Sequence, residues 1–436
     1  MRDEGGVFTI TSVFPSVTGP AYAPFLMGRF PGPIGLSGLR WYDRERKASR
    51  LPGHSRSYVG VEMRRIDTDI DPSAPTIFDL VGSSVAALNM INRGLPAENR
   101  IGYGLPFVVR TAKTHFSGKV SGWLSIDRYI ARRVAEQIRK KNPEFVFAAL
   151  TGIDKTSHSE GHSGAYVDRA LAIVDNAVAE IRFDAESRGT WEKTHLWVVS
   201  DHGHSPVSKH EDLAGFVRRM GFRSIAHPFV YTPRAEAAVM VSGNSMAHIY
   251  LDLARRDRPW LPSLSPRWQA LRDGLLARES VDLMIVPVAH GECQVHGRGR
   301  GHATMQWNRD SITYTPVTGD PLGMGAHDAL TLDESYDLTF ATEYPDSLVQ
   351  ISRISDSPRS GEIILSAARD WDFRAKYEPI PHYSSHGALH RDHMLVPLLM
   401  NKLPNRKPRR TVDVMPSALA ALSRPIPPGL DGTSFI

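Results

Sequence analysis

A carboxylate and an imidazole stand next to each other at Asp201-His202, directly after the apolar run 196–199. Carboxylate oxygens and imidazole nitrogens are ligands that zinc takes from proteins. If the run is a β-strand, it delivers both groups to the carboxyl edge of a sheet, where open α/β folds build their sites. The pair therefore predicts one part of a metal site.

Two further segments of the chain carry the same residue types. The apolar run 145–150 is followed by Asp154, and His158 comes about one helical turn later. Another histidine, His386, follows the apolar run 362–365 at a greater distance. A single Asp-His pair after a strand is more often a helix cap with a hydrogen-bonded histidine than a metal site. The conjunction of three such segments is what favours a metal site.

The composition is that of an ordinary globular protein, with 436 residues of which 41% are hydrophobic and 23% charged. The formal net charge is only +5, and the scattered basic residues give no nucleic-acid footprint. Because Cys293 is the only cysteine, a cysteine-based zinc cage is excluded. No apolar stretch approaches the ~18 residues of a membrane span, so the chain as given is expected to be soluble and cytoplasmic. An upstream signal peptide and the oligomeric state stay open.

Apolar periodicity alternates between helix and strand in the first half of the chain. The predicted elements are a helix over 126–141, a strand over 145–150, a helix over 166–182 and a strand over 194–200. This alternation predicts an α/β fold with a mostly parallel central sheet flanked by helices. The less regular segment of about 205–380 is expected to contain the rest of the sheet and an insertion that could cap the site, within a single domain of residues 1–436.

The order of four motifs along the chain resembles a known family. The motifs are Phe14-Pro15-Ser16-Val17-Thr18-Gly19-Pro20, Asp154-Lys155-Thr156-Ser157-His158, Ser200-Asp201-His202-Gly203 and Ser385-His386-Gly387. They are similar to the nucleophile segment and the metal-ligand motifs of type I phosphodiesterases and nucleotide pyrophosphatases, within the alkaline phosphatase superfamily. Residues 410–417 and Asp431-Gly432 also resemble the closing helix and turn of that superfamily. The resemblance covers nearly the whole chain and implies an alkaline phosphatase-like fold.

The resemblance implies a site with two Zn²⁺ ions. By residue type and order, one ion would be bound by Asp154, His158 and His386, and the other by Asp201, His202 and Thr18. Coordination to zinc favours the alkoxide of a threonine, so Thr18 would be the nucleophile and would form a covalent phosphothreonine intermediate. The implied substrate is a small phosphorylated compound: a phosphodiester, a phosphomonoester or a phosphonate.

One aspartate of the family's site has no counterpart in this sequence. In the family it ends a strand well before the nucleophile and binds the same ion as the threonine, whereas only 17 residues precede Thr18 here. We expect this chain to be an N-terminally shortened version of a longer protein, without one central strand. The alternative is a non-catalytic or impaired member of the superfamily that acts as a binding protein because this ligand is absent.

Residues beside the motifs bear on the substrate. Nucleotide pyrophosphatases hold a phosphate oxygen with an asparagine, and Leu39 stands at that position here. Leucine cannot donate a hydrogen bond, which disfavours a nucleotide diester. The neighbouring Arg40 could supply charge to a monoester, although an exposed surface arginine is the simpler interpretation. Four further residues lie close to the motifs in sequence and could contact the metal ligands or the leaving group, although a structural or solvated role is the simpler interpretation for most of them: Lys155, His162, His204 and His390.

Motifs of other enzyme classes are absent from the sequence. There is no G-x-S-x-G of serine hydrolases and no G-x-x-x-x-G-K-[ST] of nucleotide-binding P-loops. Cys293 does not stand in the C/S-x-P/A-x-R setting of sulfatases, and Thr18 occupies the position at which phosphomutases carry a serine. These absences leave phosphoester or phosphonate hydrolysis as the favoured reaction.

Overall fold

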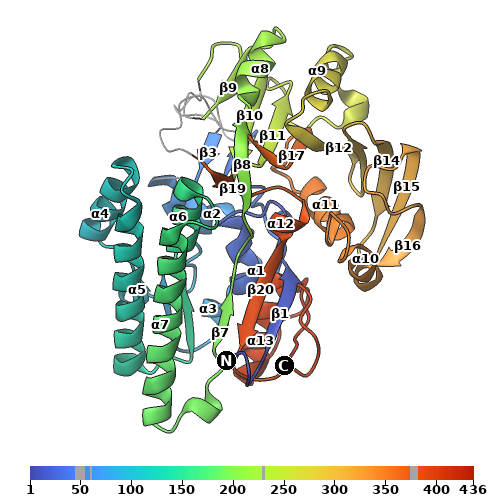
Figure 1. The fold of residues 1–436 in the computed structure, drawn as a ribbon. Helices are drawn as coiled ribbons and strands as arrows, with labels where there is room; N and C mark the ends of the chain where they lie inside the picture. Colours follow the sequence, from blue (N-terminus) through green and yellow to red (C-terminus); the bar gives the residue numbers. More distant parts are fainter. Residues whose placement is uncertain (45–54, 59–60, 228–230, 374–381) are drawn as a thin grey trace.

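The computed structural model of the chain describes residues 1–44, 55–58, 61–227, 231–373 and 382–436. The strands that lead to Thr18, Asp154, Asp201 and His202 belong to two separate three-stranded sheets (Figure 1). The first has the order β1-β20-β7 and consists of β1 (Val7–Thr11), β20 (Leu395–Met400) and β7 (Trp197–Val199). The second has the order β5-β4-β6 and consists of β5 (Arg100–Ile101), β4 (Ser84–Ala87) and β6 (Phe145–Ala148).

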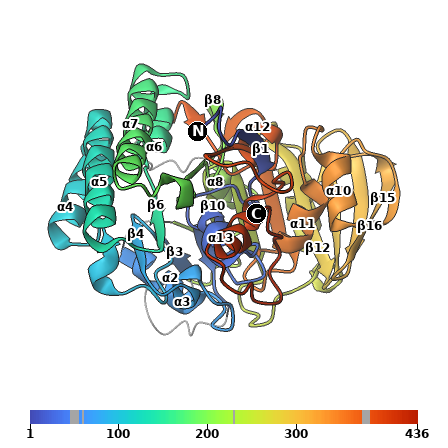
Figure 2. The same cartoon turned by 90° about the horizontal axis from the view of Figure 1, so that it is seen from below.

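Three helices cover one side of these strands (Figures 1 and 2). Helices α5 (Val120–Lys141) and α7 (Ala165–Ser187) pack against each other, and both contact the short helix α6 (Gly152–Glu160). Apolar residues three or four positions apart give α5 one buried face, and that face packs on β4 and β5. Helix α5 ends at Asn142, which adopts the left-handed conformation common at helix C-termini.

The opposite side of the strands holds the largest hydrophobic core. Helix α1 (Ala23–Met27) is completely buried there and shares its core with β20 and with helix α13 (Val414–Ala421). Gly28 ends α1 in the left-handed conformation at φ +61°, as the sequence predicts from a glycine at this position. The segment that carries Thr18 lies between β1 and α1, so both elements fix its position.

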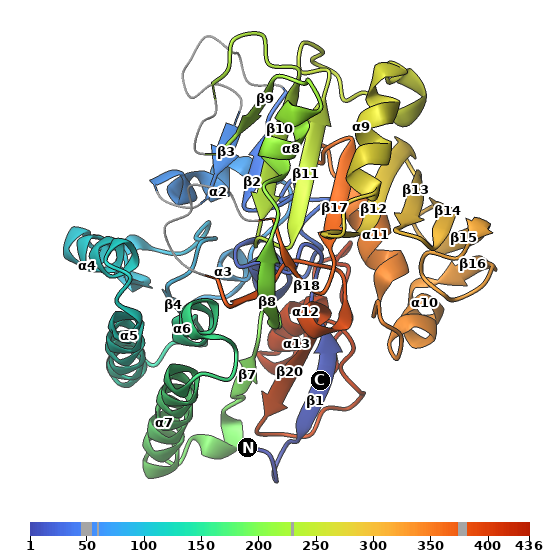
Figure 3. The same cartoon turned by 45° about the horizontal axis from the view of Figure 1, so that its top comes forward.

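A nine-stranded sheet extends away from these elements (Figure 3). Its strands, in the order in which they pair, are β16 (His327–Thr331), β15 (Ser311–Gly319), β14 (Gly301–Trp307), β13 (Glu292–Gly297), β12 (Val281–Ala289), β17 (Ile363–Ala367), β11 (Met246–Leu251), β10 (Ala237–Ser242) and β9 (Ser224–Ala226). All of these strands come from the segment 205–380, which the sequence predicts to hold the rest of the sheet and an insertion. The division of the chain into domains stays a prediction.

The remaining elements are short or lie at the periphery. The helices are α2 (Ile66–Asp69), α3 (Ile77–Leu80), α4 (Leu105–Phe116), α8 (Leu213–Arg219), α9 (Arg267–Leu276), α10 (Leu332–Thr339), α11 (Ser347–Ser355) and α12 (Arg391–Met394). The strands are β2 (Arg40–Tyr42), β3 (Ser55–Ser57), β8 (Ser205–His210), β18 (Asp370–Asp372) and β19 (Ser384–Ser385). Within the described ranges, none of the helices is both long enough and apolar enough to cross a membrane.

The predicted α/β class with helix-flanked strands is confirmed, and the pairing of the strands is mixed. Parallel ladders occur in β5-β4-β6, between β9 and β10 and between β8 and β18, whereas the other named ladders are antiparallel. The sheet is therefore not mostly parallel, because β20 runs antiparallel to both of its neighbours and the inserted strands form hairpins. The predicted helices are present but longer, since α5 begins at Val120 and α7 ends at Ser187.

Strands β6 and β7 both lead into the predicted site but belong to different sheets. No ladder joins them in the part of the chain that the structure describes. The expectation that a central strand is absent from this chain stays a prediction.

Candidate metal centre

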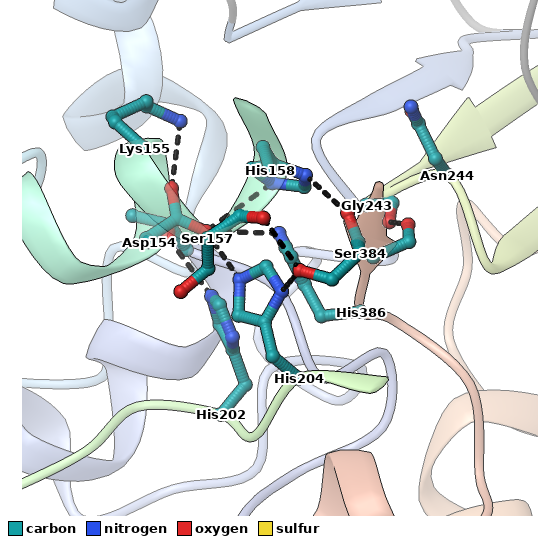
Figure 4. Close-up of polar contacts among 12 residues, drawn as sticks. Asp154, Lys155, Ser157, His158, His202, His204, Gly243, Asn244, Ser384 and His386 are labelled. Carbon is teal, nitrogen blue, oxygen red and sulfur yellow. Dashed lines mark hydrogen bonds and ion pairs between the residues drawn. The ribbon is translucent and has the colours of Figure 1, made fainter. Parts of the chain in front are cut away.

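Four separate segments bring the predicted site residues into one cluster. Thr18 comes from the loop after β1, Asp154 and His158 from α6, Asp201 and His202 from the loop after β7, and His386 from the loop after β19. In Figure 4 the side chains of Asp154, His158, His202 and His386 point toward one another. The structure therefore places residues that lie up to 368 positions apart in the sequence around one small volume.

Helix α6 presents Asp154 and His158 on one face, because residues four positions apart lie one above the other on a helix. Its first turn is held by Asp127, a fully buried residue of α5. The two carboxylate oxygens of Asp127 accept hydrogen bonds from the backbone N–H groups of Thr151 and Gly152, at 3.0 and 2.7 Å. Asp127 thereby fixes the start of the helix that carries two of the predicted ligands.

The loop after β7 makes a tight turn that requires glycine at position 203. A Cβ atom on Gly203 would collide with the backbone carbonyl of Asp392. The Gly203 N–H also donates to the His393 carbonyl at 2.9 Å, and the Ser12 hydroxyl donates to the Asp201 carbonyl. Close contact with the chain around α12 thus sets the direction of Asp201 and His202.

The distances around Asp154 match those between ligands of one metal ion. Nε2 of His158 and Nε2 of His386 lie 3.2 and 3.5 Å from Oδ1 of Asp154. In a tetrahedral zinc site with bonds of about 2.0–2.2 Å, ligand atoms are roughly 3.3–3.6 Å apart. These three residues therefore fit one divalent ion without rearrangement of the backbone.

A second group with similar spacing adjoins the first. Thr18 Oγ1 lies 3.2 Å from Nε2 of His202, and Oδ2 of Asp201 lies 3.6 Å from the same nitrogen. The rings of His202 and His386 stack with centroids 3.7 Å apart, so the two groups of ligand residues are in contact. One ligand atom from each of Asp154, His202, His204 and His386 lies within 4.8 Å of all the others. The cluster could thus hold one or two divalent ions.

Hydrogen bonds hold three histidines with one ring nitrogen free for a metal. Nδ1 of His158 faces the Ser384 carbonyl at 2.9 Å, Nδ1 of His386 faces the Ser16 carbonyl at 2.9 Å, and Nδ1 of His202 faces the Gly203 carbonyl at 3.1 Å. A carbonyl can only accept, so in the neutral ring the hydrogen resides on Nδ1. The lone pair of each Nε2 then points into the cluster, as in metal-ligating histidines.

The charge states also suit metal binding. Burial lowers the pKa of His158, and burial together with the neighbouring His202 holds the pKa of His386 well below its usual value. Burial opposes ionisation of Asp154, but Lys155 and His158 outweigh it and hold the pKa of this carboxyl well below its usual range. Near neutral pH Asp154 is therefore an ionised carboxylate and His158 and His386 are neutral imidazoles, which are the forms that bind a metal.

His204, for which a structural or solvated role is the simpler interpretation from sequence, lies at the centre of the cluster in the structure. His204 Nε2 lies 2.9 Å from Oδ1 of Asp154, and burial lowers the pKa of His204 to about 3. One signal was available, because residues two positions apart in an extended segment point to the same side, and this relates His204 to His202. Lys155 also contacts Asp154, through an ion pair of 2.7 Å to Oδ2.

Other residues considered from the sequence lie apart from this cluster or beside it. His162 is exposed, and the ring of the buried His390 packs on His393. A methyl group of Leu39 comes within 3.3 Å of the position that a Cβ on Gly19 would take, so Leu39 lies next to the Thr18 segment. The backbone of Arg40, in β2, contacts the hydroxyl of Ser242 at 3.4 Å.

Comparison with solved structures shows the same fold in phosphorus-directed enzymes. Phosphonoacetate hydrolase from Sinorhizobium meliloti 1021, in complex with phosphonoformate, matches with a TM-score of 0.54 and 14% identity, over 96% of this chain and 88% of that chain. Human ectonucleotide pyrophosphatase/phosphodiesterase 5 matches with a TM-score of 0.58 and 12% identity, over 99% and 90%. A mutant of the alkaline phosphatase PafA matches with a TM-score of 0.60 and 12% identity, over 99% and 92%.

These likenesses establish an alkaline phosphatase-like fold. Among curated proteins, none matches this chain. The model of the family described as type I phosphodiesterase/nucleotide pyrophosphatase matches residues 1–393. The chain therefore belongs to the type I phosphodiesterase/nucleotide pyrophosphatase family.

Proposed function

We propose that this chain is a metal-dependent phosphohydrolase that cleaves phosphoester or phosphonate bonds with Thr18 as its nucleophile. The observation that carries the proposal is the position of the Thr18 hydroxyl, 3.2 Å from Nε2 of His202 and beside the Asp154 cluster. Two Zn²⁺ ions are proposed as the cofactors, one bound by Asp154, His158 and His386 and the other by Asp201, His202 and Thr18.

The chemistry divides between the bound ions and the chain. Divalent ions at these positions would act as Lewis acids, favouring the alkoxide of a hydroxyl ligand and neutralising charge on the phosphoryl oxygens. Thr18 Oγ1 attacks phosphorus, the bond from phosphorus to the leaving group breaks, and phosphothreonine forms at position 18. Water then attacks the same phosphorus atom, which restores the hydroxyl and releases the phosphoryl product.

The proposed substrate is a small phosphorylated or phosphonylated compound. Family relatives in solved structures are named as phosphonoacetate hydrolase, nucleotide pyrophosphatase/phosphodiesterase and alkaline phosphatase. A murine ectonucleotide pyrophosphatase/phosphodiesterase 5 is complexed with AMP. Beside the Thr18 segment of this chain, Leu39 and Met90 offer apolar contacts and no hydrogen-bond donor. This environment favours a monoester, a phosphonate or a non-nucleotide diester over a nucleotide diester.

Metal analysis and a substrate panel test the proposal together. The purified protein should bind about two zinc ions per chain, and it should turn over at least one of a set of aryl phosphate monoesters, aryl phosphate diesters and phosphonates. The variant Thr18→Ala should retain the ion at Asp154 and lose turnover. If two metals are bound and no member of the panel is cleaved, the proposed reaction is wrong.

The second candidate function is a non-catalytic binding protein. It is favoured by the composition of the second group, in which Asp201 supplies the only carboxylate among the described residues that contact His202. Weak or single occupancy by zinc, without turnover of any substrate in the panel, would support this candidate.

A further inference from the structure

We propose that the outer face of helix α4 (Leu105–Phe116) docks the protein on a membrane surface that carries anionic lipid headgroups. The outer face consists of five apolar residues at helical spacing: Leu105, Val108, Val109, Ala112 and Phe116. Helix α4 carries none of the proposed metal ligands, so this role is independent of the proposed reaction.

Helix α4 lies at the outer edge of the molecule in all three ribbon views and packs against α5 (Figures 1, 2 and 3). The contacts with α5 come from one side of α4. The ring of Phe107 stacks on Tyr129, with centroids 5.7 Å apart, and the guanidinium of Arg110 lies over the same ring. His115 meets Trp123 edge to face, with ring centroids 6.5 Å apart. This side of α4 therefore faces the protein.

The opposite side of α4 carries apolar side chains that reach solvent. At 3.6 residues per turn, Leu105, Val109 and Phe116 lie about half a turn around the helix from Phe107. Their exposed fractions are 73%, 58% and 79%. None of the twelve residues of α4 is buried. The apolar stripe of α4 thus points away from the protein, whereas a surface helix of a globular protein normally turns its stripe toward the core.

An exposed stripe of this kind marks an interaction surface. Contiguous apolar side chains with polar residues around them are typical of contacts with proteins or membranes. A helix with one apolar side and basic residues beside it lies in the plane of a membrane interface, with the apolar side about 5–10 Å deep. Because α4 lies at the edge of the molecule, its outer face can enter a lipid layer without movement of the rest of the fold.

The charge of the surrounding sequence favours anionic lipids. Residues 99–126 include no Asp or Glu, and they include four basic residues: Arg100, Arg110, Lys113 and Lys119. Lys113 and Lys119 are exposed, and Lys113 lies within α4 beside the outer face. A basic residue close to a membrane strengthens binding to anionic headgroups by roughly fivefold. The segment therefore combines apolar insertion with attraction to negative charge.

A second copy of this chain fits the outer face less well. A symmetric dimer uses the same surface on both copies, so contact through α4 would bring two basic segments together. Residues 99–126 supply no carboxylate that could offset the repulsion between Lys113 and Lys119 of the two copies. Anionic headgroups supply the opposite charge, which is why we assign the outer face to a membrane.

Phe183 of α7 offers a matched control for Phe116. Its side chain is 68% exposed, so a change there removes a similar apolar surface from a helix. The basic residues around Phe183 are already paired with carboxylates. Arg139 contacts Glu180 at 3.0 Å, and Arg182 contacts Glu186 at 2.7 Å. Phe183 thus shares the exposure of Phe116 but not its surplus of positive charge.

The test measures sedimentation of the full chain with vesicles of phosphatidylcholine alone or mixed with phosphatidylglycerol. We expect binding to the mixed vesicles that weakens as salt is added. Phe116→Ser should weaken it by roughly tenfold or more, because the aromatic ring no longer enters the lipid. Lys113→Ser should weaken it by roughly fivefold, and Phe183→Ser should bind as the unchanged protein does.

A fluorescent label shows whether the outer face itself enters the lipid. Val109→Cys can be labelled selectively with an environment-sensitive dye, because the only native cysteine, Cys293, is buried. Its emission should shift to the blue on mixed vesicles, whereas a dye at Phe183→Cys should not respond. Equal binding to both kinds of vesicle, or unaltered binding by Phe116→Ser, overturns the proposal. A dimer that Phe116→Ser dissociates, without any vesicle binding, overturns it in favour of a second copy.

Discussion

The hydroxyl of Thr18 lies 3.2 Å from Nε2 of His202, and Nδ1 of the same ring faces the Gly203 carbonyl. Because Nδ1 carries the ring hydrogen, Nε2 offers a lone pair to the hydroxyl or to an ion shared with it. Both arrangements hold Oγ1 in place and assist loss of its proton. This relationship joins a residue of the segment after β1 to one of the loop after β7, and it supports the proposed role of Thr18 as the nucleophile.

Replacement of Thr18 tests its role directly. Thr18→Ala should lower kcat/KM for the best substrate of the panel by roughly 10³-fold or more, because nucleophile removal abolishes the covalent route. The ion at Asp154 should stay bound, whereas the ion at Asp201 and His202 should bind more weakly because it loses one of its three proposed ligands. Thr18→Ser keeps the hydroxyl and is the matched control, expected to retain measurable turnover. Equal activity in the alanine variant would exclude Thr18 as the nucleophile.

Removal of one ligand tests the assignment of the first ion. His158→Ala should reduce bound zinc from about two ions per chain to about one, because three protein ligands become two. Bound zinc stabilises only the folded state, so the melting temperature of this variant should respond less to added zinc. His162→Ala, a change in an exposed residue next to the same helix, should keep both properties. Unchanged zinc content in His158→Ala would contradict the assignment.

Sequence reasoning found the ligand pairs whose members lie close together in the chain. The four-residue spacing of Asp154 and His158 and the adjacency of Asp201 and His202 are visible in the sequence because a helix turn and a strand end create them. The resemblance of ordered motifs added Thr18 and assigned His386 to the same ion as Asp154 and His158. The central position of His204 depends on Ser384, a residue from a distant segment, and local periodicity carries no information about such a contact.

The inserted sheet was harder to predict for the same reason. Strand β17 (Ile363–Ala367) pairs between β11 and β12, although both of these strands come more than 70 residues earlier in the chain. Apolar runs predict that β11 and β12 exist, but register and neighbours follow from packing of residues far apart in sequence. The expectation of a mostly parallel sheet was wrong because it extended the local β-α-β pattern to these strands and to β20.

A substitution at Gly203 tests how strongly the backbone of the loop after β7 positions Asp201 and His202. Gly203→Ala places a methyl group against the Asp392 carbonyl, so the loop after β7 must shift. We expect a loss of about 1–3 kcal/mol in the free energy of unfolding, together with weaker binding of the ion at Asp201 and His202. Gly104→Ala is the control, because a Cβ there meets only the Pro106 ring at an ordinary contact distance of 3.8 Å. Denaturant unfolding and zinc titration measure both effects, and a stable Gly203→Ala protein with full affinity would contradict them.

The buried carboxyl of Asp127 makes the free energy of unfolding depend on pH, and the direction of this dependence follows from its pKa. Burial raises the pKa of Asp127 to about 7, although the Gly152 and Thr151 N–H groups oppose the shift. In the unfolded chain this carboxyl titrates near its usual value of about 3.9. Between these values the folded state holds a proton that the unfolded state has released, so protonation favours folding. The contribution is complete below about pH 4 and disappears as the pH rises through about 7.

The variant Asp127→Asn should remove this dependence, because its amide is neutral at every pH and its oxygen still accepts a backbone N–H. Between pH 4 and pH 7, ionisation of this carboxyl should lower the free energy of unfolding of the unchanged protein by an amount on the order of 4 kcal/mol. The variant should not show this decrease. Urea unfolding at a series of pH values measures the difference between the two proteins. Asp175→Asn, an exposed change on α7, should reproduce the unchanged profile. Parallel pH profiles for the unchanged protein and Asp127→Asn would show that Asp127 is ionised in the fold, and that its carboxylate holds the first turn of α6 as an anion.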